Sequence, residues 1–524
     1  MRMVSSVFSN IPPLFSHLAD IVSGDIDCSQ LSLKAHSTDG SPYQVRPQAV
    51  LYPKTTSDIK HAISFAKEYS IPLTVCGGIT AASGGALGEG VIIDMTRYFS
   101  HIRHVNMMEH TVTVDAGVSI DDLRNRLAAW NLEIPVLQEE DSRATIGGLV
   151  ATKSATRGSF YAGTIREWIE GMTIVVDSGE EHTIKDGTTP SGRLLGIYQS
   201  VFPLLSEHEP TLRAARREPS DDATGYALWS TSIGPRQLLD QLVGSEGTLA
   251  IITSITFRVI ARKPRSAHVL VPITNLSVME SAVAIGKRHH VEGMFMFDYT
   301  FKNMVDMFHP LLLRPELPET PYYLTLSIRD TNEEAVSKKI RALIKALPFP
   351  YPEEFLLPEK TLAKLSAHTF LHSLFDAYTK GAHMVATSGE GLIVPIHSYA
   401  ECVQALDESL LKSGLLYTLT GFAGSGHIAL TASFDAKSET FEKDLQEFRE
   451  RITSIVTGFK GGISAVGGDG LEKTASLSLV FNEATRDVFK KLKQAWDPQA
   501  IFNPGKKLAI AKEFLISHAI RTFL

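Results

Sequence analysis

A glycine-rich stretch at residues 72–88 constrains the fold of this chain more than any other feature. It contains five glycines among small hydroxyl and alanine residues, and it begins with a predicted strand. Because glycine lacks a Cβ, successive backbone N–H groups can turn toward one anion and hold phosphate without many basic side chains. The stretch therefore predicts a diphosphate-binding loop. A plain surface loop is the alternative, because glycine is common in loops.

The spacing of these glycines excludes two well-known nucleotide-binding motifs. The stretch does not read Gly-x-x-x-x-Gly-Lys-Ser/Thr, and no Gly-x-Gly-x-x-Gly opens a helix after the first strand. Its surroundings predict a helix at 56–69, a buried strand at 91–94, a strand at 111–115 and a helix at 121–130. A second turn of small and hydroxyl residues follows at 141–148.

Length, charge and cysteine content limit the class of protein. A chain of 524 residues exceeds the size of one hydrophobic core, so at least two domains are expected. The net charge of −7 argues against nucleic acid as a partner. Three separated cysteines exclude a disulfide framework and predict a reducing, cytoplasmic setting. The sequence has no run long and apolar enough for a transmembrane segment, and it leaves peripheral membrane contact open.

An ordered series of short motifs accompanies the glycine loop. They are Pro-x-x-Val-x-x-Pro at 47–53, Ile-Asp at 93–94, Val-x-Ala-Gly-Val at 114–118, Thr-Ile-Gly-Gly at 145–148, Gly-Ser-Glu-Gly-Thr-Leu at 244–249 and Asn-Pro-Gly-Lys at 503–506. With these motifs the chain resembles the FAD-linked oxidases of the vanillyl-alcohol oxidase type, which have a PCMH-type FAD-binding domain. Within that family it is most similar to the branch of the glycolate oxidase subunit and D-lactate dehydrogenase.

The resemblance implies an α+β fold with a cofactor domain and a substrate domain. A PCMH-type FAD-binding domain of two subdomains is expected at 41–262, after an N-terminal helical segment at 1–40. An α+β cap with an antiparallel sheet, covered by helices on one side, is expected at 263–458. The last segment, 459–524, is expected to return to the FAD-binding domain. A charged stretch with a proline at 261–265 fits the boundary between the two domains.

The resemblance also implies which residues hold FAD. The first loop would cradle the diphosphate, the second would line the adenosine and isoalloxazine side, and the Gly-Ser-Glu-Gly segment would hold the adenine end. Relatives with covalent flavin carry a histidine directly after the paired glycines. This chain has Ile79 there, which offers no nucleophile, so FAD is expected to be non-covalent. The expected FAD-binding residues are Gly77, Gly78, Thr80, Ser83, Gly84, Gly85, Asp141, Ser142, Thr145, Gly147, Gly148, Glu246, Gly247, Ile251, Ile252 and Asn503.

A metal site of the hydroxyacid branch lacks its ligands in this sequence. That branch carries Gly-His-x-Gly-Asp-Gly-Asn-Leu-His on the cap and Gly-Glu-His-Gly near the end. Two of those histidines and the glutamate bind a divalent metal, and the last histidine takes the substrate proton. At the matching positions this chain has Phe422 and Ala429 for the ligand histidines, Val466 for the glutamate and Gly467 for the base. None of these side chains offers a ligand atom, so no metal is expected there.

Other residues must then supply the catalytic groups. The candidates are His427, Asp469, Lys473, Tyr299 and Lys380, of which the first two and the last are preferred. By resemblance His427 faces the cap pocket, or it is a hydrogen-bonded structural histidine. Asp469 follows the glycines that replace the base and is either a carboxylate base or a turn residue. Lys380 lies near the place of an arginine that binds the substrate carboxylate in relatives.

The predicted function is FAD-dependent oxidation of a small-molecule substrate. A hydride would pass from an alcohol or a 2-hydroxyacid-like substrate to flavin N5, and a quinone, an electron-transfer protein or oxygen would reoxidise the flavin. One alternative is a transferase resembling alkylglycerone-phosphate synthase, a type that carries a run of histidines near its flavin. The one adjacent histidine pair in this chain is His289–His290. Another alternative is a flavin-binding protein that has lost turnover.

Overall fold

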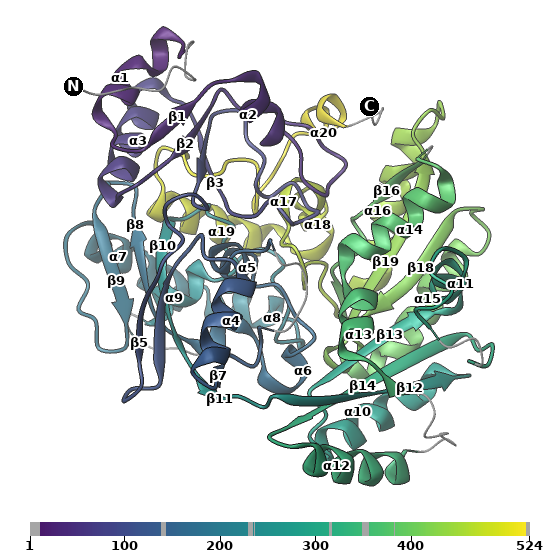
Figure 1. The fold of residues 1–524 in the computed structure, drawn as a ribbon. Helices are drawn as coiled ribbons and strands as arrows, with labels where there is room; N and C mark the ends of the chain where they lie inside the picture. Colours follow the sequence, from purple (N-terminus) through teal and green to yellow (C-terminus); the bar gives the residue numbers. More distant parts are fainter. Residues whose placement is uncertain are drawn as a thin grey trace.

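The chain folds into two lobes that lie side by side (Figure 1). The computed structural model describes residues 11–137, 143–228, 234, 236–313, 317–347, 356–381 and 383–519. One lobe contains the N-terminal half of the chain together with the C-terminal segment, coloured yellow in Figure 1. The other lobe, in green, is the cap formed by the residues between them. The α+β fold expected from the sequence is confirmed.

A four-stranded sheet carries the glycine-rich loop. It contains β1 (Asp25–Asp27), β2 (Ala49–Tyr52), β4 (Val91–Asp94) and β3 (Leu73–Cys76) in this spatial order, and α3 (Thr56–Tyr69) connects β2 to β3. Strands β2, β4 and β3 run parallel, and β1 is antiparallel to β2. The apolar residues Ile59, Ile63 and Ala66 are buried, and a capping box of Thr55 and Asp58 fixes the start of α3. The helix and the buried strand predicted on either side of the loop are confirmed.

A five-stranded antiparallel sheet forms the second part of this lobe. It contains β5 (Ile102–Asn106), β6 (Thr111–Asp115), β10 (Ile251–Arg258), β8 (Ile169–Val175) and β9 (Glu181–Lys185) in this spatial order. Its helices are α4 (Ile120–Ala129), α5 (Ile146–Thr152), α7 (Gly192–Glu207), α8 (Glu209–Ala215) and α9 (Arg236–Leu242). The strand and helix predicted at 111–115 and 121–130 are confirmed. Helix α5 packs on β10, which brings the second glycine turn close to the Gly-Ser-Glu-Gly segment.

The cap is built on one antiparallel sheet. Its order is β15 (Leu356–Leu357), β12 (Arg265–Ile273), β14 (Tyr322–Asp330), β13 (Gly293–Asp298), β18 (Leu416–Gly421), β19 (His427–Asp435) and β16 (His383–Ala386), and β17 (Leu392–Ile393) pairs with β19. Strands β18 and β19 form a hairpin around residues 423–426. The hairpin brings Phe422 and His427 to its turn, at the end of the sheet that faces the N-terminal lobe.

Helices cover both faces of the cap sheet, whereas the sequence predicted one covered face. Helices α10 (Met279–Arg288), α12 (Glu333–Ala346), α15 (Tyr399–Leu410) and α16 (Phe441–Gly458) lie on one side, and α11 (Tyr299–Phe308), α13 (Glu359–Ser366) and α14 (His368–Thr379) lie on the other. The reason is that alternate strand residues are apolar on both faces. Val269 and Val271 belong to one core, Leu270 belongs to the other, and all of β13 is buried.

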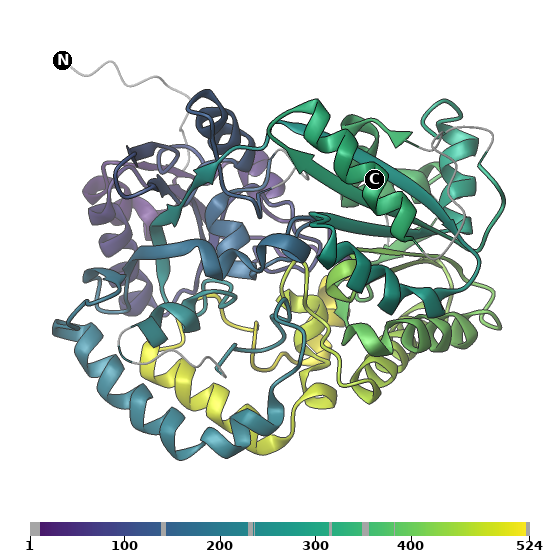
Figure 2. The same cartoon turned by 90° about the horizontal axis from the view of Figure 1, so that it is seen from below.

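The C-terminal segment crosses from the cap back to the N-terminal lobe. It contains α17 (Gly470–Thr474), α18 (Leu477–Val480) and α19 (Glu483–Trp496), and Figure 2 shows α19 running beside α7. Beyond α19 the chain extends the first sheet, because the N–H of Leu73 donates to the carbonyl of Ile501 at 2.8 Å and the N–H of Asn503 donates to the carbonyl of Leu73 at 2.8 Å. This return brings the Asn-Pro-Gly-Lys motif next to the glycine-rich loop.

The remaining described elements are short. The N-terminal segment expected to be helical contains the edge strand β1 as well as α1 (Pro13–Ile21) and α2 (Gln30–Ala35). No helix in the described ranges combines the length and the apolar character that a membrane span requires. The other elements are β7 (Leu132–Glu133), α6 (Ser159–Ala162), η1 (Ile165–Trp168), β11 (Ile260–Ala261), η2 (Leu276–Val278), η3 (Ile396–Ser398), η4 (Ala423–Ser425) and α20 (Lys512–His518).

Candidate active site

Both lobes line one cavity. Its volume is about 280 Å³, counted as the space that the centre of a water molecule can occupy. We call its two sides the N-terminal wall and the cap wall. The N-terminal wall comes from residues 75–86, 144–155 and 246–252. The cap wall comes from α13, α14, the loop before β17 and the ends of β13, β18 and β19, and the C-terminal segment closes one side. The predicted cofactor residues that line the cavity are Gly77, Gly78, Thr80, Ser83, Gly85, Thr145, Gly147, Gly148, Glu246, Gly247 and Ile252.

The two glycine loops of the N-terminal wall pack backbone against backbone. A Cβ on Gly77 would come within 2.0 Å of the hydroxyl of Thr145, and a Cβ on Gly78 would come within 1.8 Å of the carbonyl of Arg143. Side chains at these two positions would therefore push the loops apart. In the described part of the chain, the N–H groups of residues 77–83 donate no hydrogen bond. A run of unpaired N–H groups beside a cavity fits the binding of a diphosphate.

Open space lies in front of other small residues on this wall. A Cβ on Gly247 would meet only the side chain of Val75, at 4.0 Å, and Gly247 has a φ of +67° that favours glycine. A Cβ on Gly148 would meet only the Thr145 hydroxyl, at 3.2 Å. The hydroxyl of Thr145 accepts the N–H of Gly148 at 3.3 Å and so caps α5. The N-terminal wall thus offers main chain and small residues to a bound group, as a dinucleotide cofactor requires.

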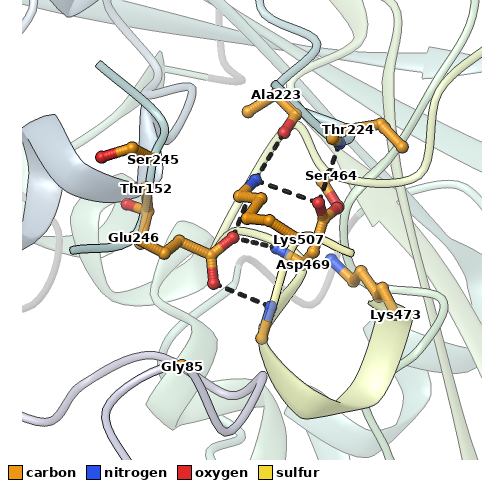
Figure 3. Close-up of polar contacts among 12 residues, drawn as sticks. Gly85, Thr152, Ala223, Thr224, Ser245, Glu246, Ser464, Asp469, Lys473 and Lys507 are labelled. Carbon is orange, nitrogen blue, oxygen red and sulfur yellow. Dashed lines mark hydrogen bonds and ion pairs between the residues drawn. The ribbon is translucent and has the colours of Figure 1, made fainter. Parts of the chain in front are cut away.

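The carboxylate of Glu246 holds the C-terminal segment in place (Figure 3). It accepts the N–H of Asp469 at 2.6 Å and that of Gly470 at 2.8 Å, and it pairs with the ammonium of Lys507 at 2.8 Å. Lys507 also pairs with Asp469 at 3.0 Å and donates to the carbonyl of Ala223 at 2.8 Å. Burial lowers the pKa of Lys507, but the two carboxylates outweigh burial and raise it. Glu246 therefore joins the N-terminal wall to the C-terminal segment through a buried ion network.

Several predicted cofactor residues do not line the cavity. Asn503 lies behind the wall, where its amide donates to the carbonyls of Gly85 and Glu246 at 2.9 and 2.7 Å. Gly84 turns its N–H to the carboxylate of Asp39 at 2.9 Å, and Ile251 is buried in β10. These three residues shape the wall and do not face the cavity. The predicted residues Asp141 and Ser142 lie outside the described residues.

The three preferred catalytic residues do not come together. His427 lines the cavity, but its Nδ1 accepts the N–H of Phe422 at 3.2 Å and its Nε2 lies 3.0 Å from the carbonyl of Glu390. Burial lowers the pKa of His427 to about 4, so the ring is neutral and both nitrogens are occupied by backbone. This arrangement fits the other interpretation from the sequence, in which His427 is a hydrogen-bonded structural histidine. It does not fit a catalytic group, which needs a ring nitrogen available to substrate.

Asp469 and Lys380 are corrected for a different reason, because neither lines the cavity. The carboxylate of Asp469 is buried between Lys507, the Ser464 hydroxyl and the N–H of Gly225. Lys380 is exposed at the C-terminal end of α14, in the left-handed conformation. The turn geometry hides Asp469 from any substrate, and the helix end points Lys380 away from the cavity.

Three ionisable residues that the sequence analysis missed form a cluster on the cap wall. His368 and His372 lie four residues apart on α14, and both Nε2 atoms face the carboxylate of Glu390. The distance from His372 Nε2 to Glu390 Oε1 is 2.7 Å. Burial would raise the pKa of Glu390, but the two histidines outweigh burial and hold it below its usual value. The His-x-x-x-His spacing on an amphipathic helix was the available signal, because residues i and i+4 share one helix face.

Lys473, which the sequence named as a further candidate, lies at the C-terminal side of the cavity. Its ammonium donates to the carbonyl of Val466 at 3.2 Å, and burial lowers its pKa. A Cβ on Gly391 would come within 2.5 Å of this ammonium, which places Lys473 beside the loop that carries Glu390. The positions matched to the metal ligands of relatives, Phe422, Ala429 and Val466, line the same cavity.

Comparison with known proteins finds relatives along most of the chain. Residues 47–185 match the family described as FAD binding domain, and residues 265–507 match FAD linked oxidases, C-terminal domain. A D-lactate dehydrogenase of Anaerostipes hadrus is 24% identical, over 88% of this chain and 90% of that protein. A D-2-hydroxyglutarate dehydrogenase of Pantoea ananatis is 23% identical over 92% of this chain but only 50% of that protein. A solved alkyldihydroxyacetonephosphate synthase shares the fold, with a TM-score of 0.64, 15% identity and coverage of 96% of this chain and 87% of that chain.

Proposed function

This chain belongs to the FAD-linked oxidases, and we propose that it oxidises a 2-hydroxyacid or a similar alcohol by hydride transfer to flavin N5. It is an FAD-linked oxidoreductase with FAD as its cofactor. The observation that carries the proposal is the cavity itself, in which the N–H groups of residues 77–83, which donate no hydrogen bond to the described residues, lie opposite a cap wall with ionisable side chains. Bound FAD would accept the hydride there and pass the electrons to a second acceptor.

The N-terminal wall supplies binding for the cofactor. The N–H groups of the first glycine loop support the diphosphate, and the small residues Gly148 and Gly247 leave room for the rest of the cofactor. Ile79 lines the cavity directly after the paired glycines. Its side chain has no nucleophilic atom, so we propose that FAD is bound non-covalently.

The cap wall supplies groups for the substrate. In the described ranges, the ionisable residues that line the cavity are Cys76, Glu246, His368, Glu390, His427 and Lys473. Burial raises the pKa of Cys76 well above its usual value, Glu246 is bound to Lys507, and His427 has both ring nitrogens occupied. Among these residues we propose His368, Glu390 and Lys473 as the groups that act on substrate.

These groups suit a substrate that carries a hydroxyl beside a carboxylate. The ammonium of Lys473 would pair with the substrate carboxylate, since an anion compensates for the burial of this cation. The pair of His368 and Glu390 would take up the hydroxyl proton as the carbinol carbon loses its hydride. The substrate classes of the D-lactate and D-2-hydroxyglutarate dehydrogenases share this chemistry. The proposal uses no metal at Phe422, Ala429 and Val466, because these side chains have no ligand atoms.

The transferase alternative rests on fold alone. His289 and His290, the adjacent histidines that the sequence singled out, follow α10 on the far face of the cap sheet and do not line the cavity.

We also propose a quinone, an electron-transfer protein or oxygen as the second acceptor, and cytoplasmic localisation from the separated cysteines.

Flavin reduction tests the proposed function. Purified protein is mixed without oxygen with D-lactate, D-2-hydroxyglutarate, glycolate and simple alcohols, and the visible flavin absorption is followed. Bleaching by a 2-hydroxyacid is the expected result, and denaturation should release free FAD. Protein that binds FAD but is reduced by none of these compounds would favour lost turnover, and protein without flavin would contradict the proposal. Reoxidation by air, a quinone or a cytochrome then identifies the acceptor class.

A further inference from the structure

We infer that His368, His372 and Glu390 form a binding site for one divalent metal ion of the zinc type, open toward the cavity. The two imidazoles and the carboxylate each offer one ligand atom, and these atoms all lie within 4.8 Å of one another. Two histidines and one carboxylate are a common ligand set for zinc and for other first-row divalent metals. None of the three residues belongs to the motifs in which relatives carry their metal ligands.

Local structure brings the ligand atoms to one point. His368 and His372 are the first and fifth residues of α14, so their side chains lie on the same helix face, with ring centroids 4.0 Å apart. Glu390 approaches from the loop between β16 and β17 and is buried. Two atoms that bind one tetrahedral metal at about 2.0–2.2 Å lie about 3.3–3.6 Å apart. His372 Nε2 and Glu390 Oε1, which are hydrogen-bonded at 2.7 Å, would therefore move slightly apart to admit the ion. Small side-chain rotations would therefore complete the site.

Neighbouring groups hold the glutamate in its orientation. The hydroxyl of Thr431 donates to Glu390 Oε1 at 3.1 Å, and the ring of His427 bonds to the backbone carbonyl of Glu390 at 3.0 Å. Such outer contacts orient metal ligands and strengthen binding. His427 is therefore a positioning residue, because its ring holds the loop that carries the Glu390 carboxylate.

The site has an open side. His368 and Glu390 line the cavity, together with Lys473 and Phe422, so a metal held by the three residues would be reached from the cavity. Three protein ligands leave at least one coordination position for a substrate oxygen. If the proposed function holds, this oxygen is the hydroxyl or carboxylate of the 2-hydroxyacid, and the metal would polarise it before hydride loss. His368 would then act as a ligand, and Glu390 would bind the metal through one carboxylate oxygen and keep the other to take up the hydroxyl proton. The metal would thus be bound by a different set of ligands from that of the relatives. It would lie in the same cavity where Phe422, Ala429 and Val466 stand at the positions matched to the relatives' ligands.

Cobalt binding tests the inference independently of turnover. The FAD-loaded full-length protein is stripped with a chelator and titrated with Co²⁺, and bound metal is measured by equilibrium binding and visible absorption. We expect one Co²⁺ per chain with absorption typical of nitrogen and oxygen ligands. His372→Ala and Glu390→Gln should weaken binding by about 100-fold or more, since loss of an outer contact alone costs about 10–100-fold. Thr431→Val should cost about tenfold.

Matched controls separate metal loss from misfolding. His397→Ala removes an exposed cap histidine outside the cluster and should leave Co²⁺ binding unchanged. Retained flavin absorption in each variant shows that the fold is intact, and the Thr431 variant keeps all three ligands if the others fail to fold. A wild-type protein that binds no Co²⁺ would overturn the inference. Unchanged binding in His372→Ala would overturn it as well, because the metal would then lie elsewhere, as at the second cluster of His36, Cys76 and Asp94.

The outcomes distinguish this inference from the proposed function. Co²⁺ binding that depends on His372 and Glu390, without flavin reduction by any substrate, would support the metal site and contradict the activity. Flavin reduction that survives chelation, in a protein without Co²⁺ binding, would support the activity and contradict the metal site.

Discussion

The two walls of the cavity differ in the chemical groups from which they are built. The N-terminal wall presents backbone N–H groups and small residues, and its glycines are set by contacts in which a Cβ would collide with another loop. The cap wall presents large or ionisable side chains, including Phe295, Phe422, His368 and Glu390. A wall made of backbone binds a cofactor shared by a whole family, whereas a wall made of side chains can change its chemistry by substitution. Substitutions on the cap wall can therefore change the groups that face the substrate while the backbone of the N-terminal wall stays the same.

The largest expected effect concerns the ion network that joins the N-terminal wall to the C-terminal segment. Lys507→Met leaves the buried carboxylates of Glu246 and Asp469 without their cation. Breaking a buried ion pair in this way costs about 3–5 kcal/mol, so urea unfolding should show a loss of that size together with weaker flavin retention. Lys490→Met changes an exposed lysine on α19 and serves as the control. Equal stability of the two variants would show that the network does not hold the C-terminal segment on the N-terminal wall.

The next effect tests whether His427 is a neutral structural group. Its pKa is lowered to about 4 by burial, from 6.5, so the unfolded chain binds more protons between these two values. Stability should therefore fall as the pH drops through this window, and the contribution of this one group is about 3 kcal/mol at most. His427→Asn cannot titrate and should flatten the decline, measured as unfolding free energy from pH 7 to pH 4. The exposed His397→Asn should keep the wild-type slope, and the same slope in both variants would contradict the assignment.

A third test asks which lysine binds the substrate carboxylate. Lys473→Met removes the cation beside the cavity and should raise KM for a 2-hydroxyacid by about 10–100-fold, the range for a lost bond to a charged group of about 1.5–3 kcal/mol. The FAD content of both variants is measured as well, so that a change in KM is separated from a loss of cofactor. Lys380→Met should leave KM unchanged, since Lys380 is exposed and does not line the cavity. The opposite pattern, with KM raised by the Lys380 variant, would restore the interpretation drawn from the sequence.

The smallest expected effect concerns the backbone contacts of the N-terminal wall. Gly78→Ala places a Cβ 1.8 Å from the carbonyl of Arg143, so the two loops must move apart. Overpacking of this kind costs about 1–3 kcal/mol, which corresponds to a loss of about 5- to 150-fold in FAD affinity. The ratio of flavin to protein after dialysis measures it. Gly458→Ala is the matched control, because its Cβ would meet nothing within 4 Å. Full flavin retention in Gly78→Ala would show that the loop contact does not shape the site.

Prediction from sequence succeeded where the signal is local. The helices and strands around the motifs could be predicted because side-chain periodicity and glycine spacing depend on neighbouring residues. Prediction from sequence did not reach contacts between distant segments. The sequence assigned Glu246 to the cofactor from its flanking glycines, but it gave no sign that the carboxylate of Glu246 binds Lys507. The one-sided cap was wrong for a similar reason, because both faces of β12 and β13 are apolar and only packing shows which helices cover them.

The sequence by itself determined the family of the protein and predicted the glycine-rich loops of the N-terminal wall. Both predictions depend on glycines at fixed spacings. Such spacings can be recognised in the sequence without knowing which distant residues the glycines contact. The tertiary structure alone decided which ionisable groups meet in the cavity. It buried Asp469 in an ion network, occupied both nitrogens of His427 with backbone, and brought His372 to Glu390 across the cap wall. Side-chain chemistry becomes a site only when separate segments converge, and that convergence is a property of the packed fold.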